Sequence, residues 1–138
     1  MTVLDVSATA LSRARARLGS RADRVNWIVA DVTGDWQVPR VDVWHDRAVF
    51  HFLTVAAQRN TYVAHLRRSL ESGGTAIIAT FAPDGPAECS GLPVARYSAE
   101  AITALLGPDF ALAEAVNECH QTPTGGRQSF SYGRFIRR

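Results

Sequence analysis

The chain has 138 residues, enough for one domain with a buried core and too few for two comfortable ones. Its composition, 46% hydrophobic and 20% charged with no apolar run of membrane-span length, is typical of a soluble globular protein without a transmembrane segment. The N-terminus lacks the basic and apolar regions of a secretory signal, so we expect a cytoplasmic location. Cys89 and Cys119 form no motif typical of a disulfide framework or a zinc site.

Arginines carry the positive side of a formal net charge of +2, and one cluster of them lies between residues 13 and 24. Clustered arginines with interleaved aromatic residues are typical of nucleic-acid binding. Here the cluster shares a helical stretch with an apolar stripe formed by Leu11, Ala14 and Leu18. The pattern favours the solvated face of an amphipathic helix, so we expect no nucleic-acid partner.

The first third of the chain predicts a strand, a helix and two further strands. Residues 3–6 are an apolar run with one acid, and Ser7 can cap a helix that ends at Gly19. Residues 25–30 are rich in strand-forming side chains, and residues 41–45 alternate apolar and polar side chains. Both runs are predicted to be strands.

The middle of the chain predicts a helix followed by a central strand. Residues 54–71 repeat apolar side chains at helical spacing, with Thr54 as the cap and the pair Gly73-Gly74 at the end. Residues 75–81 are close to continuously apolar, as expected of a strand that is covered on both faces.

The last third predicts one more helix and an antiparallel strand pair. Ser98 can cap a helix that ends at Gly107. Residues 110–120 and 128–136 are strand-like and are separated by turn-forming residues, although part of the first run is also compatible with a helix. The alternation of strands and helices predicts an α/β fold with a mainly parallel sheet.

Acidic residues follow the predicted parallel strands. Asp5 lies at the carboxyl end of the first strand, where its two oxygens can accept hydrogen bonds from both hydroxyls of a ribose. Asp31 ends the next strand, and Asp46 directly follows the third. For Asp46 and Arg47, a structural ion pair or a helix-start charge is the alternative interpretation.

These acids occur together with two longer patterns, DVWHDRAVFHFL at residues 42–53 and LESGGTAII at residues 70–78. In this order and spacing the sequence resembles a class I S-adenosylmethionine (SAM) dependent methyltransferase over essentially its whole length. The resemblance implies SAM as the cofactor, a small-molecule substrate and one domain over residues 1–138. It also implies a Rossmann-like, mainly parallel sheet with helices on both faces and a C-terminal antiparallel strand pair.

The resemblance implies cofactor-binding residues at the ends of three strands. In the order ribose, adenine and methionine part, they are Asp5 with Val6, Asp31 with Val32, and Asp46 with Arg47.

Phe50 and His51 would line the substrate side. Histidine has a near-neutral pKa, so His51 and His120 are candidate general bases, with a purely structural role as the alternative for each. No other catalytic residue is assigned, and the four histidines have no metal-ligand spacing, so we expect no metal site.

The family's first strand and its glycine-rich turn have no counterpart in this sequence, because nothing before Val3 can supply them. We therefore expect a methyltransferase-like domain that is truncated at its N-terminus, and no strong activity without that turn. The alternative is a non-catalytic remnant or a gene model that starts too late. A nicotinamide-dependent oxidoreductase would account for Asp5 but not for Asp31. The methyl acceptor and the oligomeric state are not specified by the sequence.

Overall fold

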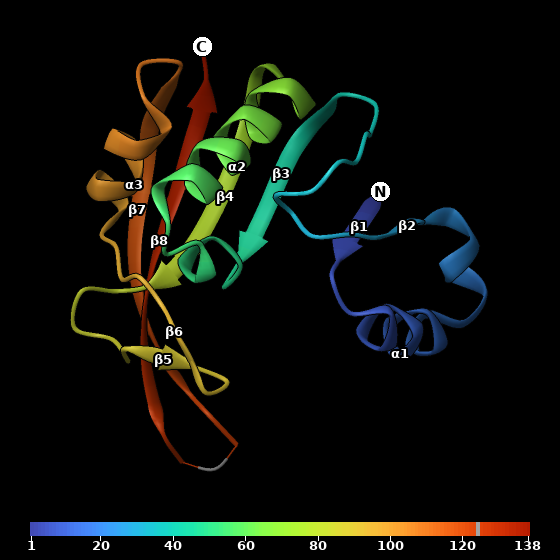
Figure 1. Cartoon of the computed structure of the whole chain (residues 1–138), viewed down its shortest axis with the longest axis horizontal. Helices are drawn as coiled ribbons and strands as arrows, with labels where there is room; N and C mark the ends of the chain where they lie inside the picture. Colours follow the sequence, from blue (N-terminus) through green and yellow to red (C-terminus); the bar gives the residue numbers. More distant parts are fainter. Residues whose placement is uncertain (124) are drawn as a thin grey trace. The chain divides into compact units, whose positions relative to one another are not determined.

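Figure 1 shows the computed structural model of the chain, which describes residues 1–123 and 125–138. The chain divides into two compact units, unit 1 (Met1–Pro39) and unit 2 (Arg40–Arg138). The parallel strands β1 and β2 form a sheet in unit 1, and unit 2 has a four-stranded sheet of its own. The expectation of a single domain over residues 1–138 stays a prediction. Among the described residues, no helix is both long enough and apolar enough to cross a membrane.

Unit 1 is the strand, helix and strand that the sequence predicts. Its elements are β1 (Thr2–Asp5), α1 (Ala8–Leu18), the 3-10 helix η1 (Gly19–Arg24) and β2 (Asn26–Val29). β1 and β2 are parallel, with Asp5 paired opposite Val29. Ser7 caps α1 as predicted, because its hydroxyl accepts a hydrogen bond from the Ala10 N–H at 3.1 Å.

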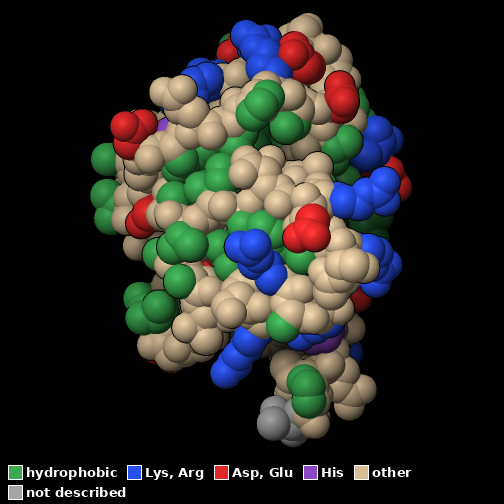
Figure 2. All heavy atoms as spheres, turned by 90° about the vertical axis from the view of Figure 1, so that its right-hand side faces the viewer, with side chains coloured by type: hydrophobic (Ala, Val, Ile, Leu, Met, Phe, Trp, Pro, Cys, Tyr) green, Lys and Arg blue, Asp and Glu red, His purple; other side chains and the backbone are tan. Residues whose placement is uncertain are grey.

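The arginine-rich segment of unit 1 is a solvated helix face, as predicted. Leu11 is buried beneath α1, whereas Arg13, Arg15 and Arg17 are exposed. On the face of the molecule that Figure 2 shows, basic side chains are dispersed among acidic and hydrophobic ones. The helix thus has the amphipathic pattern of an ordinary surface helix.

Unit 2 contains a mixed sheet, two helices and a short hairpin. Its elements are β3 (Val41–Arg47), the 3-10 helix η2 (Phe50–Phe52), α2 (Ala56–Ser69), β4 (Leu70–Phe81), β5 (Glu88–Cys89), β6 (Leu92–Pro93), α3 (Ala99–Leu106), β7 (Phe110–Gln121) and β8 (Arg127–Arg137). The larger sheet has the order β3-β4-β8-β7, and β5 pairs with β6 in a separate hairpin.

The prediction of a mainly parallel sheet is wrong for unit 2. β3 and β4 are parallel, but β4 with β8 and β8 with β7 are antiparallel. The reason is the position of the C-terminal hairpin. The predicted antiparallel pair exists, and its second strand inserts next to β4, so the hairpin contributes two antiparallel pairings. The fold is therefore α/β with a mixed sheet.

The two helices of unit 2 lie on the same face of its sheet, in front of the strands in Figure 1. Helices on both faces were expected, and in this unit they are not found among the described residues. α2 begins one residue later than predicted: Val55 is its N-cap, and the Val55 N–H donates to Gln58 Oε1 at 3.4 Å. It ends at Ser69, because Leu70 already has the extended backbone of β4.

Alternation along the strands separates a helix-covered face from a far face of this sheet. Asp46 and Ile78 are buried on the helix-covered face. Val43 and Arg47 point to the far face, where 57% of the Val43 side chain is exposed. The two faces therefore give neighbouring residues on β3 opposite environments.

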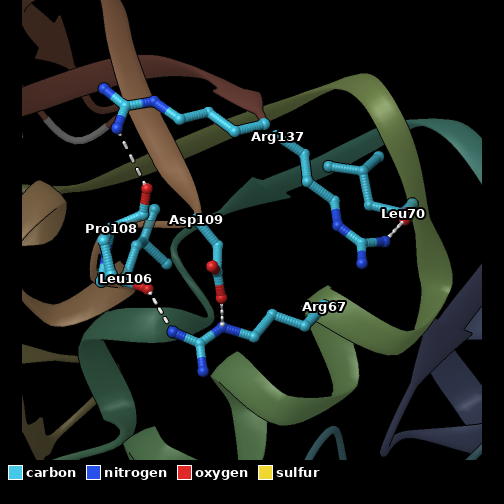
Figure 3. Close-up of polar contacts among 7 residues, drawn as sticks. Arg67, Leu70, Leu106, Pro108, Asp109 and Arg137 are labelled. Carbon is cyan, nitrogen blue, oxygen red and sulfur yellow. Dashed lines mark hydrogen bonds and ion pairs between the residues drawn. The ribbon is translucent and has the colours of Figure 1, made fainter.

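A cluster of arginines joins the helices to the sheet at the end where β4 begins (Figure 3). Arg67 Nε lies 3.0 Å from Asp109 Oδ2, and its Nη2 donates to the Leu106 carbonyl at 2.8 Å. Arg137 Nη1 donates to the Leu70 carbonyl. These contacts connect α2, the end of α3 and β8. They lie at the amino end of β4 and leave its carboxyl end, the expected ligand side, for other contacts.

Candidate functional site

In unit 1, two acids lie at the carboxyl end of the parallel pair. Asp5 is the last residue of β1, and its carbonyl accepts a hydrogen bond from the Ala30 N–H at 3.1 Å. Asp31 follows that contact directly. In open α/β sheets this edge is where ligands bind, so the fold brings together the two acids that the sequence singled out.

Each of these carboxylates uses one oxygen to shape its own turn. Asp5 Oδ1 accepts the Ser7 N–H at 2.7 Å. Asp31 Oδ1 accepts both the Thr33 N–H and the Thr33 hydroxyl, each at 2.7 Å. The backbone hydrogen bond and then the hydroxyl hydrogen bond lower the Asp31 pKa, so this exposed group is a carboxylate at neutral pH. The second oxygen of each acid has no partner in the described part of the chain.

The residue that follows each acid has a different environment: Val6 is exposed, whereas Val32 is held by a hydrogen bond. Val6 is 72% exposed. The Val32 carbonyl accepts the indole N–H of Trp36 at 3.1 Å, and Trp36 itself is buried. Trp36 thereby fixes the turn that follows Asp31. The sequence did not indicate this role, because a tryptophan in a loop is equally compatible with a pocket rim.

In unit 2, Asp46 is buried and fully engaged by its own chain. Its Oδ1 accepts the Val49 N–H at 2.9 Å, and its Oδ2 accepts the Phe50 N–H at 3.1 Å and the Tyr62 hydroxyl at 2.7 Å. The Trp44 indole N–H donates to the same Tyr62 oxygen at 2.8 Å. Burial raises the pKa of Asp46, and burial together with the neighbouring carboxylate raises the pKa of Tyr62.

Asp46 therefore organises the turn into η2, which matches the helix-start interpretation of this acid. Contact between its carboxylate and a cofactor stays a prediction. The turn itself is strained: Ala48 has a φ of 66°, and its N–H donates to the Ala79 carbonyl at 2.9 Å. A non-glycine residue in this region costs on the order of 1–3 kcal/mol and is typical of ligand sites.

Arg47 points away from Asp46, to the far face of the sheet. Its Nε donates to the Tyr132 hydroxyl at 3.0 Å, and its guanidinium carbon lies 4.6 Å from the centre of the Phe130 ring. The sequence expected Arg47 beside the methionine part of a cofactor and gave no sign of Tyr132. These two residues lie 85 positions apart, so only the strand pairing brings them together.

Phe50 and His51, the predicted substrate-side residues, are both fully buried. Phe50 packs against Tyr62 and Tyr97, with ring centres 4.9 and 5.6 Å apart, which makes it a core residue. The His51 ring lies against Phe81, 4.8 Å between ring centres. Neither side chain forms an open substrate wall in this conformation.

The two candidate general bases lie on one aromatic cluster, because Phe81 and Phe130 pack between His51 and His120. His51 Nδ1 accepts the Phe81 N–H at 3.3 Å, and burial lowers the His51 pKa to about 4. A neutral ring that accepts at Nδ1 carries its proton on Nε2. The Nδ1 lone pair is thus used by the Phe81 N–H and is not available to a substrate proton, and the buried Nε2 has no hydrogen-bond partner among the described residues.

Among the residues that the structure describes, no group of three or more histidine, cysteine, aspartate or glutamate side chains could hold a metal ion. The candidate groups of unit 1 are the carboxylates of Asp5 and Asp31, and those of unit 2 are a carboxylate, one arginine and aromatic side chains. Groups of these kinds fit the polar contacts of an organic ligand.

A family described as methyltransferase domain matches residues 1–78 of the chain. The chain belongs to this family of methyltransferase domains. The matched segment includes both acids of unit 1 and the whole of β3, η2 and α2. A search of curated proteins finds no match to the sequence.

Solved structures of methyltransferases share the fold of this methyltransferase domain. The N-methyltransferase NodS of Bradyrhizobium japonicum WM9, in complex with S-adenosyl-L-homocysteine, has a TM-score of 0.73 and 19% identity, covering 99% of this chain and 65% of NodS. The 1,6-didemethyltoxoflavin-N1-methyltransferase of Burkholderia thailandensis has a TM-score of 0.72 and 19% identity, covering 99% of this chain and 60% of that chain. The glycopeptide N-methyltransferase MtfA has a TM-score of 0.70 and 14% identity, and the match covers 99% of this chain and 73% of MtfA.

The methyltransferase domain described here spans about 65% of the length of NodS. At these identities the likeness shows the fold.

Proposed function

We propose that this chain carries the cofactor-binding and substrate-side elements of a SAM-dependent methyltransferase that acts on a small molecule. The family match is the observation that carries the proposal. It is supported by two structural relatives that are named as N-methyltransferases and hold S-adenosyl-L-homocysteine (SAH), one of them together with the small molecule 1,6-didemethyltoxoflavin. A single domain over residues 1–138 with a Rossmann-like sheet, built on the parallel pairings β1-β2 and β3-β4, belongs to the same proposal.

The residues of unit 1 fit the polar parts of SAM. Asp5, with Val6 beside it, has a carboxylate oxygen left for ribose hydroxyls, which donate hydrogen bonds. Asp31 is ionised and exposed, so its second oxygen can accept from the adenine amino group, with Val32 next to the ring. Both acids lie at one edge of one parallel pair, as a single nucleoside would require.

SAM supplies an electrophilic methyl group on a sulfonium, and its transfer is an in-line displacement. The protein then has to hold the acceptor in line and exclude water, and it needs little acid–base chemistry. The side chains of unit 2 fit that task. Asp46 and Tyr62 fix the turn after β3, and His51 Nδ1 accepts the Phe81 N–H, so this lone pair is not available as a base. Asp46, Arg47, Phe50 and His51 are proposed to lie at the methionine and acceptor end.

Calorimetry with the full chain and SAH tests the proposal. We expect saturable binding that Asp5→Asn and Asp31→Asn each weaken by about tenfold, the usual effect of removing one charge-assisted hydrogen bond. Asp23→Asn is the matched control, because Asp23 is an exposed acid of the same unit in η1. A folded chain that binds NADH and not SAH would overturn the proposal in favour of an oxidoreductase.

A further inference from the structure

The far face of the unit 2 sheet carries a row of residues near the carboxyl ends of β3 and β4. Arg47 pairs with Ala79 on β4, and Ala79 pairs with Tyr132 on β8. Paired residues point to the same face of a sheet, so these three side chains lie side by side. Arg47 is the last residue of β3, which places the row at the edge where open α/β sheets bind ligands.

The guanidinium of Arg47 is held at two points. Its Nε donates to the Tyr132 hydroxyl at 3.0 Å, and its guanidinium carbon lies over the Phe130 ring, 4.6 Å from the ring centre. Ala79 lies on β4, between Arg47 on β3 and Tyr132 on β8. Its side chain is only a methyl group, so the arginine side chain can extend across it. A planar cation that is stacked and anchored in this way loses little further freedom when it binds a ligand.

This arrangement leaves donors without acceptors. No acidic side chain in the described part of the chain forms an ion pair with Arg47, and its two Nη groups have no partner there. The neighbouring Arg134, on the same face of β8, is paired with Glu114 at 3.1 Å. The Tyr132 oxygen accepts from Arg47, so its own hydrogen is free to be donated to a third group.

We propose that Arg47 and Tyr132 form a binding site for the carboxylate of a ligand. The two Nη groups of a guanidinium match the two oxygens of a carboxylate, and the Tyr132 hydroxyl adds a donor beside them. This inference rests on the proposed function. The carboxylate belongs either to the acceptor molecule or to the methionine part of SAM, and both sources offer the same chemistry to this pair.

The first arm of the test uses calorimetry on the full chain with SAH and with methylthioadenosine, which lacks the amino-acid carboxylate. If the cofactor supplies the carboxylate, Arg47→Gln and Tyr132→Phe weaken SAH binding, by about tenfold for Arg47→Gln, and leave methylthioadenosine binding unchanged. Arg47→Lys recovers part of the affinity that Arg47→Gln loses, because lysine keeps the positive charge but cannot donate to both carboxylate oxygens in the planar geometry of a guanidinium. Arg134→Gln is the matched control on the same face.

The second arm uses benzoate and its neutral counterpart benzamide as probes at millimolar concentration. If the acceptor supplies the carboxylate, benzoate perturbs the NMR signals of the Arg47 Nε–H and the Tyr132 ring, benzamide does not, and Arg47→Gln removes the effect. This arm does not require SAM binding, so it remains decisive if the proposed function fails. The inference is overturned if folded Arg47→Gln and Tyr132→Phe bind SAH and benzoate as the unmodified chain does.

Discussion

Unit 1 and unit 2 each place an acid at the end of a parallel strand, and the two units treat these acids in opposite ways. Asp31 is exposed and uses one oxygen in its own turn. Asp46 is buried, and its two oxygens accept three hydrogen bonds from its own chain. Asp31 lies two residues after β2 and Asp46 is the penultimate residue of β3, and their surroundings decide the role of each. An acid at a strand end can thus be a ligand group or a structural one, depending on the donors that the fold brings to it.

The pKa shifts of these two acids have opposite signs because their largest causes differ. Hydrogen bonds lower the Asp31 pKa while solvent remains available, so its contribution to stability is present above its unfolded pKa and is lost as the pH falls. Burial raises the Asp46 pKa, so its contribution becomes less favourable as the pH rises through the folded value.

Asp46→Ala is expected to have the largest effect, lowering the free energy of unfolding by about 3–5 kcal/mol. The substitution leaves the Tyr62 hydroxyl and the Phe50 N–H buried without an acceptor, and it removes the acceptor of the part-buried Val49 N–H. Urea unfolding followed by circular dichroism measures it. Asp42→Ala, at an exposed position of the same strand, is the control and should change stability by less than about 0.5 kcal/mol. Equal effects of the two substitutions would refute the structural role of Asp46.

Removing the buried histidine should alter the pH dependence of stability. Burial lowers the folded-state pKa of His51 from its ordinary value of 6.5 to about 4, so its contribution to stability is complete above pH 6.5 and declines toward pH 4. We expect the unmodified chain to lose on the order of 2 kcal/mol between pH 7 and pH 4.5 from this group, a loss that His51→Gln does not show. Urea unfolding at the two pH values measures it, and parallel curves for both proteins would contradict the assignment.

The acids of unit 1 should affect affinity and leave stability nearly unchanged. For Asp5→Asn we expect about tenfold weaker SAH binding and a stability change below about 1 kcal/mol, because the asparagine oxygen can still accept the Ser7 N–H. Calorimetry and urea unfolding on the same sample separate the two effects. Loss of stability comparable to that of Asp46→Ala would show that both acids are structural.

The arginines of α1 should have the smallest effect. Arg13 and Arg17 are exposed on a helix surface, and the double substitution to glutamine is expected to change the free energy of unfolding by less than about 0.5 kcal/mol. Arg47, which is anchored on Tyr132 and Phe130, should instead be sensitive in ligand binding. A large effect of the α1 double variant in urea unfolding would show that this helix face is not simply solvated.

The sequence alone determined most of the elements and their order. Helical spacing and capping residues located α1 and α3 closely, since Ser7 and Ser98 cap them as predicted. The cap of α2 was misplaced by one residue, because a side-chain cap was expected at Thr54 and the structure uses Val55, whose N–H bonds Gln58. Such local signals act over a few residues, which is why they can be seen in sequence.

The tertiary structure decided what these elements do to one another. It set β8 beside β4 and so made the sheet mixed, and it brought Arg47 to Tyr132 across 85 positions of sequence. It also decided that Asp31 is exposed to solvent and that Asp46 is buried and hydrogen-bonded to Tyr62. The sequence determined that acids follow the strands and that the chain resembles a methyltransferase. Burial and strand pairing are long-range properties, so only the folded chain could decide which of those acids remains free to bind.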